Sequence, residues 1–250
     1  MKFDVITIFP EIFNSYLKEA LISRALKKGL IEFKAHDLRN WAEDRRKTVD
    51  GRPFGGGLGM VMKIDPILKA IIEVREKKLK SKVIVFTPRG KKLDQETVHD
   101  FSKLDQLIMV SGRYEGVDER VLKYIADAKI SIGDYILTGG ELPSMVVVEA
   151  VTRLIPGAVG KEGFLAERLQ KRQRKTEGMI EYSQYTRPEV FEPGKAISRK
   201  DLQKHGNVKI KSKTLKEIAG SKWRVPKDLV KGDHKKIEER RKKDGKLIWR

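Results

Sequence analysis

Apolar residues in the first part of the chain form short continuous runs that alternate with stretches of helical spacing. The runs are rich in β-branched residues and are closed by Pro or Gly, which is typical of strands buried on both faces. Five such runs are predicted to be strands: Phe3–Phe9, Ile31–Ala35, Val83–Phe86, Leu107–Val110 and Ile130–Ile132.

Between these runs the apolar positions recur on one face of a helix. Asp65 is predicted to be an N-cap, and Gly29 to end the first helix. Because strands and helices alternate, we expect an α/β fold around a mostly parallel sheet. The predicted helices are Leu17–Lys28, Pro66–Leu79, Asp118–Ile125 and Met145–Leu154.

From Lys161 onward the pattern changes. Residues 161–178 are polar and predict an exposed interdomain linker, with a solvated helix as the alternative. Short helical patterns in a basic background then predict a small helical second domain. We therefore divide the chain into 1–160, 161–178 and 179–250. The patterns cover Leu202–His205, Thr214–Ala219, Val225–Val230 and His234–Lys243.

Positive charge gathers in this second part. The 250 residues carry a formal net charge of +19, and from Lys195 onward there are 20 Lys and Arg against 7 Asp and Glu. Cations near phosphates release condensed counterions, so such a surplus favours a polyanionic partner. The alternative is a merely solvated surface, but the uneven distribution favours a catalytic body with a nucleic-acid-binding appendage.

The chain contains no cysteine. This excludes Cys-ligated zinc, iron–sulfur clusters and a thiol nucleophile, and no metal site is predicted. The apolar start lacks the pattern of a signal peptide, and no stretch approaches the roughly 20 apolar residues of a membrane span. We expect a cytoplasmic protein without a membrane partner.

A first glycine-rich loop lies within Pro53–Lys63, where four glycines occupy Gly55–Gly59. Glycine allows positive φ and close approach of backbone to a ligand. Neither dinucleotide nor triphosphate loop patterns are present. The loop is either a flexible turn or part of a site, and Met60–Met62 favour its docking against a core.

A second glycine-rich loop, Ile132–Pro143, joins the last predicted strand to an apolar helix. Gly139 and Gly140 let the backbone double back, and Pro143 fits a first helical turn. Apolar side chains beside free backbone groups suit a flat, mostly apolar heterocycle. The alternative is a tightly packed strand-to-helix connection.

Between these loops, Ser111–Arg120 carries three carboxylates, Glu115, Asp118 and Glu119. They would repel a phosphate and attract a cationic molecule, such as a sulfonium with an amino group. A capped helix start, with Asp118 near the N-cap, is an alternative that is compatible with this function.

Five motifs occur in the order and rough spacing of one enzyme family: PFGGGLGMVMK, SGRYEGVDERV, SIGDYILTGGELP, RLIPGAVG and QYTRPEV. In these motifs the chain resembles the bacterial tRNA (guanine-37-N1)-methyltransferases of the SPOUT class, over about the first 160 residues and Glu181–Val190. The resemblance implies a mostly parallel α/β sheet with a C-terminal trefoil knot, an exception among folds, and a small helical C-terminal domain that holds tRNA. It also implies S-adenosyl-L-methionine as methyl donor and a homodimer with shared active sites.

The resemblance also assigns residues. Tyr185, Thr186 and Arg187 are candidates for RNA contact. The cofactor contacts fall on Gly59, Phe86, Thr87, Pro88, Gly112, Glu115, Ile132, Gly133, Tyr135, Leu137, Gly139, Gly140 and Pro143.

Methyl transfer to guanine N1 needs a general base for the N1 proton and a group that stabilises charge on O6. Arg153 matches the family arginine with this second role; the alternative is a helix-end arginine that interacts with the helix dipole. The family's linker Asp, in a D-S-F stretch, is missing, and Arg172–Lys175 stands in its place. Glu177 or Glu167 is the predicted base, with Glu181 a further candidate.

The missing Asp leaves two alternatives to guanosine 37 methylation. One is a catalytically impaired homologue that still binds tRNA. The other is a SPOUT methyltransferase that acts on another RNA position.

Overall fold

The structure is a computed structural model that describes residues 1–57, 59–159, 179–181, 183–244 and 246–249. The chain divides into two compact units, Met1–Lys171 and Arg172–Arg250. The predicted linker 161–178 lies outside the described residues, so its boundaries stay a prediction.

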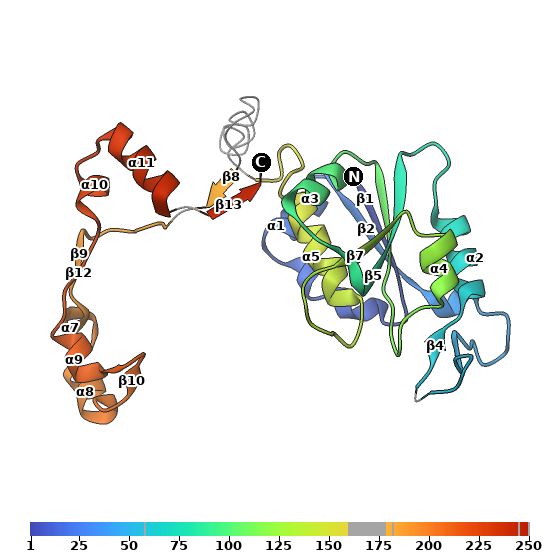
Figure 1. The fold of residues 1–250 in the computed structure, drawn as a ribbon, viewed down its shortest axis with the longest axis horizontal. Coiled ribbons are helices and arrows are strands. Elements are labelled where there is room, and N and C mark those ends of the chain that lie inside the picture. The colour runs from blue at the N-terminus through green and yellow to red at the C-terminus, as the bar shows by residue number, and fades with distance from the viewer. Residues whose placement is uncertain (58, 160–178, 182, 245, 250) are drawn as a thin grey trace. The chain divides into compact units, whose positions relative to one another are not determined.

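A five-stranded parallel sheet forms the centre of the first unit, in the order β2-β1-β6-β5-β7 (Figure 1). Every neighbouring pair is parallel, so the carboxyl ends of all five strands lie at one edge. The five predicted strands and the α/β fold are therefore confirmed. The strands are β1 (Lys2–Thr7), β2 (Glu32–Asp37), β5 (Ser81–Lys92), β6 (Gln106–Val110) and β7 (Ala128–Ser131).

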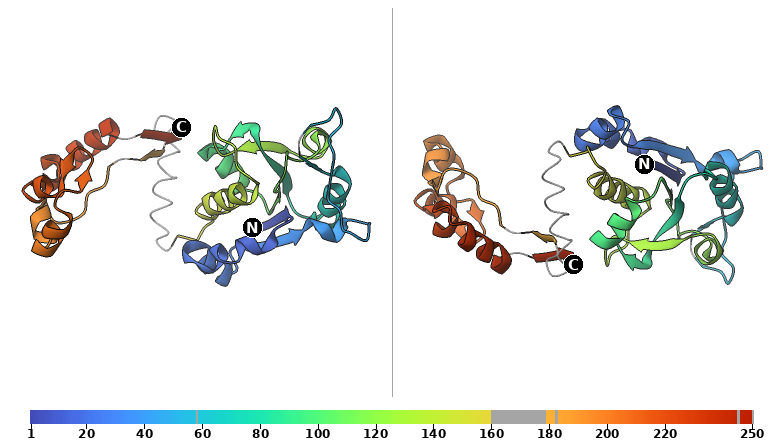
Figure 2. Two further views of the ribbon diagram at one scale, coloured as in Figure 1. Left: turned by 90° about the horizontal axis from the view of Figure 1, so that it is seen from below. Right: turned by 90° about the horizontal axis from the view of Figure 1, so that it is seen from above.

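Helices cover both faces of this sheet, with α1 and α5 side by side on one of them (Figures 1 and 2). Side chains alternate between the faces of a strand, so Phe3 and Val5 pack under one helical layer and Ile6 under the other. The first layer contains α1 (Ala20–Lys27), α3 (Gln95–Phe101) and α5 (Glu141–Thr152); the second contains η3 (Leu38–Trp41), α2 (Ile64–Val74) and α4 (Glu119–Tyr124).

Helix α2 differs from its predicted bounds at both ends. It begins at Ile64 with Lys63 as N-cap, so the N-cap predicted at Asp65 is wrong, and Asp65 pairs instead with Lys69 at 2.9 Å. The helix ends at Val74 because the buried Gln106 side chain binds the backbone there: its Nε2 donates to the Val74 carbonyl at 2.9 Å. A contact from a distant strand therefore replaces the local stop signal.

Two other helices also differ from the prediction. Helix α5 begins at Glu141, four residues before Met145, and the first predicted helix is divided into a 3-10 turn η2 (Tyr16–Lys18) and α1. Helix α3 was not predicted. It is capped by Asp94, whose carboxylate accepts a hydrogen bond from the Thr97 backbone at 2.7 Å.

Strand β5 contains a bulge over residues 87–90. Phe86 and Lys91 both pair with Ile130 of β7, so the residues between them leave the ladder. At Gly90 a Cβ atom would lie 2.6 Å from the backbone nitrogen of Ile130, which leaves room only for glycine. The bulge places Thr87–Arg89 at the carboxyl edge of the sheet.

Two short antiparallel strands hold the first glycine-rich loop. They are β3 (Asp50–Gly51) and β4 (Val61–Met62), and the loop connects them. A short 3-10 turn, η1 (Pro10–Phe13), follows β1.

The second unit consists of short helices and two-stranded ladders. Each of the four helical patterns lies in or overlaps a helix, whereas the ladders, too short for a periodic signal, were not predicted. The helices are α7 (Pro193–Ala196), α8 (Arg199–His205), α9 (Leu215–Ala219), α10 (Lys227–Val230) and α11 (His234–Asp244). The ladders pair β8 (Met179–Glu181) with β13 (Lys246–Trp249), β9 (Val190–Phe191) with β12 (Trp223–Arg224), and β10 (Lys209–Ile210) with β11 (Lys213–Thr214).

Candidate functional site

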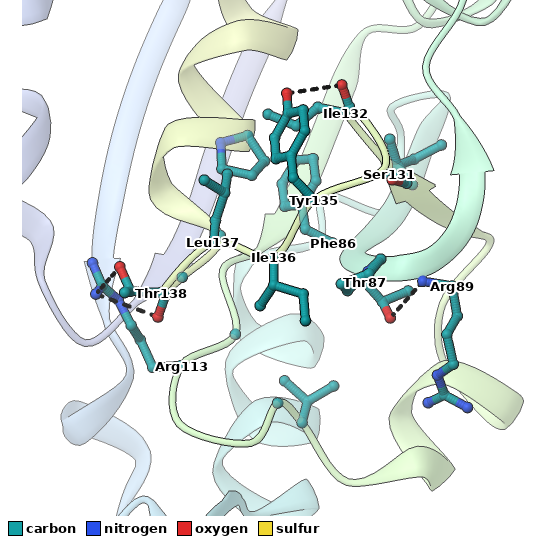
Figure 3. A pocket seen from close by; sticks show the side chains of 18 of the residues that line it. Phe86, Thr87, Arg89, Arg113, Ser131, Ile132, Tyr135, Ile136, Leu137 and Thr138 are labelled. Carbon is teal, nitrogen blue, oxygen red and sulfur yellow. Dashed lines mark hydrogen bonds between the residues drawn. The ribbon is translucent and has the colours of Figure 1, made fainter.

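A cavity of about 350 Å³ lies at the carboxyl ends of β5, β6 and β7 (Figure 3). In open parallel sheets ligands bind outside this edge, and small-molecule sites have volumes of this order. Three segments line the cavity: the β5 bulge, the turn after β6, and the second glycine-rich loop.

The predicted cofactor residues converge on this cavity. Gly59 alone is absent from the lining, and a Cβ atom there would lie 2.7 Å from Glu115 Oε1, so it borders the site. The lining contains Phe86, Thr87, Pro88, Gly112, Glu115, Ile132, Gly133, Tyr135, Leu137, Gly139, Gly140 and Pro143. That these residues bind a cofactor stays a prediction.

Apolar side chains of the second loop face the cavity. In Figure 3, Ile136 projects into the open space between Leu137 and Thr87, with Phe86 behind it. Ile136 is 86% exposed, so its side chain is available to a ligand. Tyr135 stands at the rim and donates a hydrogen bond to the Ile132 carbonyl at 3.1 Å. This surface suits a flat apolar ligand.

The second loop packs backbone against backbone on the end of β6. Gly140 donates a hydrogen bond to the Gly112 carbonyl at 2.9 Å, and a Cβ atom at Gly140 would lie 2.6 Å from Ser111 Cα. Ser144, in the first turns of α5, reaches the Ser111 hydroxyl at 2.9 Å. These contacts hold the loop backbone directly against the backbone at the end of β6.

The first glycine-rich loop is tied to the acidic turn. Glu115 donates from its backbone to the Met60 carbonyl at 3.0 Å, and Met62 donates to the Gly116 carbonyl at 2.9 Å. Met62 is completely buried. The predicted docking of Met60–Met62 against a core is therefore confirmed, while Gly55–Gly57 adopt positive φ in an exposed turn.

Two of the three clustered carboxylates are occupied within the fold. Asp118 caps α4 and binds Arg120 at 2.6 Å, and the Arg120 side chain holds the pKa of Asp118 below its ordinary value. The capped helix start is thus confirmed. Glu119 pairs with Arg89 at 2.6 Å. The Glu115 carboxylate has no hydrogen bond or ion pair with any described residue, so its charge is available to a ligand.

A buried ion pair supports the other side of the cavity, and no sequence pattern indicated it. Glu141, 1% exposed, accepts hydrogen bonds from Arg113 Nε at 2.9 Å and from the Thr7 hydroxyl at 2.7 Å. The Arg113 guanidinium lies 4.8 Å from the centre of the Phe9 ring. Since Arg89 and Arg113 are both neutralised, Glu115 supplies the uncompensated charge of the described lining.

Other lining residues were not predicted, although all except Leu122 of α4 and Ile130 and Ser131 of β7 lie in the same loops as those that were. The available signal in the sequence was that several predicted cofactor residues lie in the same loop. They are Arg89, Arg113, Tyr114, Gly116, Val117, Leu122, Ile130, Ser131, Ile136 and Thr138.

Of the predicted catalytic residues, the structure describes Arg153, which does not line this cavity. Arg153 follows the last turn of α5, exposed, and its backbone donates to Glu149. Ten residues separate it from Pro143, which at the rise of a helix is about 15 Å along the axis. Glu167 and Glu177 lie outside the described residues, and Glu181 belongs to β8.

The predicted RNA-contacting residues, Tyr185, Thr186 and Arg187, form an exposed segment before β9 in the second unit. Over the described parts of the chain, no three His, Asp or Glu residues are grouped to hold a metal ion. No helix in those parts is sufficiently long and apolar to cross a membrane.

Comparison with known proteins shows the family of this chain. The sequence model of the family described as tRNA (Guanine-1)-methyltransferase TrmD matches residues 1–217. A tRNA (guanine-N(1)-)-methyltransferase of Ruminiclostridium cellulolyticum is 43% identical over 232 residues, 92% of this chain and 91% of the relative. A protein of the same name from Stutzerimonas stutzeri is 42% identical over 232 residues, 92% of this chain and 90% of the relative. Another, from Heliobacterium modesticaldum, is 46% identical over 196 residues, 76% of this chain and 71% of the relative. The chain therefore belongs to the tRNA (guanine-N1)-methyltransferase family.

Proposed function

We propose that this protein transfers a methyl group from S-adenosyl-L-methionine to N1 of guanosine 37 in tRNA, next to the anticodon. The observation that carries the proposal is the uncompensated Glu115 carboxylate in an apolar, glycine-lined cavity, within the segment that matches the family.

The cavity fits the proposed methyl donor. Its apolar wall of Phe86, Ile136 and Leu137 would pack against the adenine ring, and loop backbone would bind the ring edge. Glu115 would face the donor's positive charge, and the two lining arginines, both paired, would not repel it. When bound, the donor supplies an electrophilic methyl group on a sulfonium sulfur.

The protein's own residues would prepare the guanine. N1 carries a proton near neutral pH, so a carboxylate must take it as N1 forms its bond to the methyl carbon and the carbon–sulfur bond breaks toward sulfur. Glu177 or Glu167 would be this base, with Glu181 a further candidate. Arg153 would stabilise the negative charge that develops on O6.

The position of Arg153 supports a shared active site. It lies about 15 Å along α5 from the cavity of its own chain, so we infer that a homodimer forms and that the partner's Arg153 serves each cavity. The match to the family supports a trefoil knot in the first unit. Residues 1–160 would form the knotted catalytic domain, 161–178 a linker, and 179–250 the tRNA-binding domain.

Labelled methyl donor and matched tRNA transcripts test the function. The full chain should label a transcript with G37 after G36, at N1, and leave the matched A37 transcript unlabelled. Equal or absent labelling of the two would refute the proposal.

The absent linker Asp favours one second candidate, a homologue that binds tRNA and donor without turnover. In that case both ligands bind and neither transcript is labelled. Label in both transcripts would instead indicate another RNA position.

A further inference from the structure

Glu141 is a buried carboxylate that lies behind the wall of the cavity and is absent from its lining. It is the first residue of α5. Its Oε1 atom accepts a hydrogen bond from the Thr7 hydroxyl at 2.7 Å, and its Oε2 atom accepts one from Arg113 Nε at 2.9 Å. Because Glu141 is 1% exposed, water screens it little, and its charge acts mainly on the arginine beside it.

Arg113 is the cation of this pair, and it does line the cavity. Figure 3 shows its side chain beside Thr138 of the second glycine-rich loop. Gly139, which also lines the cavity, lies directly against the pair: a Cβ atom there would be 2.5 Å from Glu141 Oε2. The ion pair is therefore packed against the backbone of the cavity wall.

The other arginine of the described lining is paired in a different environment. Arg89 binds Glu119 at 2.6 Å, but the two side chains are 74% and 55% exposed. Water and salt screen charges in such a place, so loss of Glu119 would change the potential in the cavity little. Loss of Glu141 would instead leave the mostly buried cation of Arg113 unpaired and weakly screened. Of these two acidic partners, Glu141 therefore controls the charge that a ligand meets.

The proposed reaction makes this charge important, since donor and product differ by one positive charge. S-adenosyl-L-methionine carries a sulfonium, whereas S-adenosylhomocysteine, which remains after methyl transfer, carries a neutral thioether. A cation beside the cavity would therefore weaken binding of the donor and not of the product. A unit charge within about 10 Å, at an effective dielectric constant of about 20–40, changes the affinity for a cation about 4- to 16-fold.

We propose that Glu141 is a specificity-determining residue: it neutralises Arg113 behind the cavity wall and thereby favours the cationic methyl donor over the neutral product. This inference rests on the proposed function for the identity of the donor. The alternative is a purely structural ion pair that holds the turn after β6 against α5. Such a pair would affect the binding of both ligands equally.

The ratio of donor Kd to product Kd distinguishes the two roles. Both constants are measured by calorimetric titration of the full chain, for the wild type and for Glu141→Gln, which keeps the shape of the side chain and removes its charge. The ratio should rise about 4- to 16-fold in the variant. The methyl group that the product lacks is the same difference in every variant, so a change in the ratio reports the charge.

Three variants serve as controls. Glu119→Gln removes the same charge from the exposed pair, and its ratio should stay within about twofold of the wild type near 0.15 M salt. Thr7→Val removes the other hydrogen bond of Glu141 without a change of charge, so both dissociation constants should change by the same factor. Arg113→Gln combined with Glu141→Gln removes both charges, and the ratio should return to that of the wild type.

Several outcomes would overturn the inference. These are an unchanged ratio in Glu141→Gln, an equal rise of the ratio in Glu119→Gln, or a double variant that keeps the altered ratio. If Glu141→Gln does not fold, Arg113→Gln decides the question. It leaves the Glu141 carboxylate unpaired, so the ratio should fall below that of the wild type, and a ratio that does not fall would contradict the inference.

Failure of the proposed function would be visible separately. If the wild type binds donor and product but does not methylate G37, the proposed function fails, while the ratios still decide the role of Glu141. A wild type that binds neither ligand would refute both the identity of the donor and this inference.

Discussion

Replacement of Gly90 by alanine would place a methyl group where the bulge of β5 lies against the backbone of β7. The added carbon would lie 2.6–2.7 Å from three backbone atoms of Lys129 and Ile130. These are backbone atoms of the edge strand β7, which cannot rotate away as a side chain can, so either the bulge or β7 must move. The bulge carries Thr87–Arg89, which line the cavity, and we therefore expect a reduction of both stability and donor affinity.

The magnitude follows from the cost of overpacking. Extra carbon in a closely packed site destabilises a protein by about 1–3 kcal/mol. Replacement of Gly by Ala also lowers the conformational entropy of the unfolded chain, which stabilises the folded state by about 0.4–1 kcal/mol. A net destabilisation of about 1–2 kcal/mol remains, which for a unit of this size lowers Tm by roughly 2–8 °C.

Thermal unfolding and calorimetric titration with S-adenosylmethionine check this expectation. Gly51→Ala is the matched control, because its added Cβ would meet only Lys63 Cε, at an ordinary 3.5 Å; it should stay within about 0.5 kcal/mol of the wild type. If Gly90→Ala has the same Tm as Gly51→Ala and binds the donor with unchanged affinity, the close packing of the β5 bulge against β7 is refuted.

Four further substitutions test the site and the fold. Glu115→Gln should weaken donor binding about 10- to 100-fold, since a hydrogen bond to a charged group contributes about 1.5–3 kcal/mol; an unchanged Kd in calorimetry would remove its role. Arg153→Ala should lower kcat about 100-fold or more with donor Kd unchanged, as for the removal of an oxyanion donor. Glu177→Gln should lower kcat by about 100-fold or more, and full activity in single-turnover assays would exclude it as the base. Asp94→Ala removes the cap of α3 and should cost about 1 kcal/mol at pH 7. Hydrogen bonds from Thr97 lower the pKa of Asp94, so this stabilisation is present above about pH 4 and is lost as pH falls through the lowered pKa, and the Tm difference between variant and wild type should narrow there.

Strands β1 and β6 and the first half of β5 were predictable because they are buried on both faces and form continuous apolar runs, whereas no residue of the edge strand β2 is fully buried. Helix ends were less so, since they depend on distant residues: Gln106 ends α2 from a strand 32 residues beyond Val74. Helix α3 is only seven residues long, too short for a periodic signal. Its cap, Asp94, would have been the available indication.

Some features of the candidate site could likewise be predicted from the sequence, and others could not. Its glycine-rich loops were recognisable one by one, because glycine clusters and loop carboxylates are local features. Their convergence depends on the order of strands in the sheet, which no local pattern encodes. The bond from Thr7 to Glu141 joins residues 134 apart, and nothing near either residue predicts the other.

The order of strands also has a consequence for biosynthesis. β1 is made before the other four strands of the sheet, and it lies between β2 and β6. One of its hydrogen-bonding edges stays open until β6 has been synthesised, a wait of roughly 5–20 s at usual elongation rates of about 5–20 residues per second. An apolar strand with an open edge is a template for wrong pairing. The nascent chain therefore passes through an interval in which chaperones or the ribosome surface must cover β1, and slow codons before Gln106 would lengthen it.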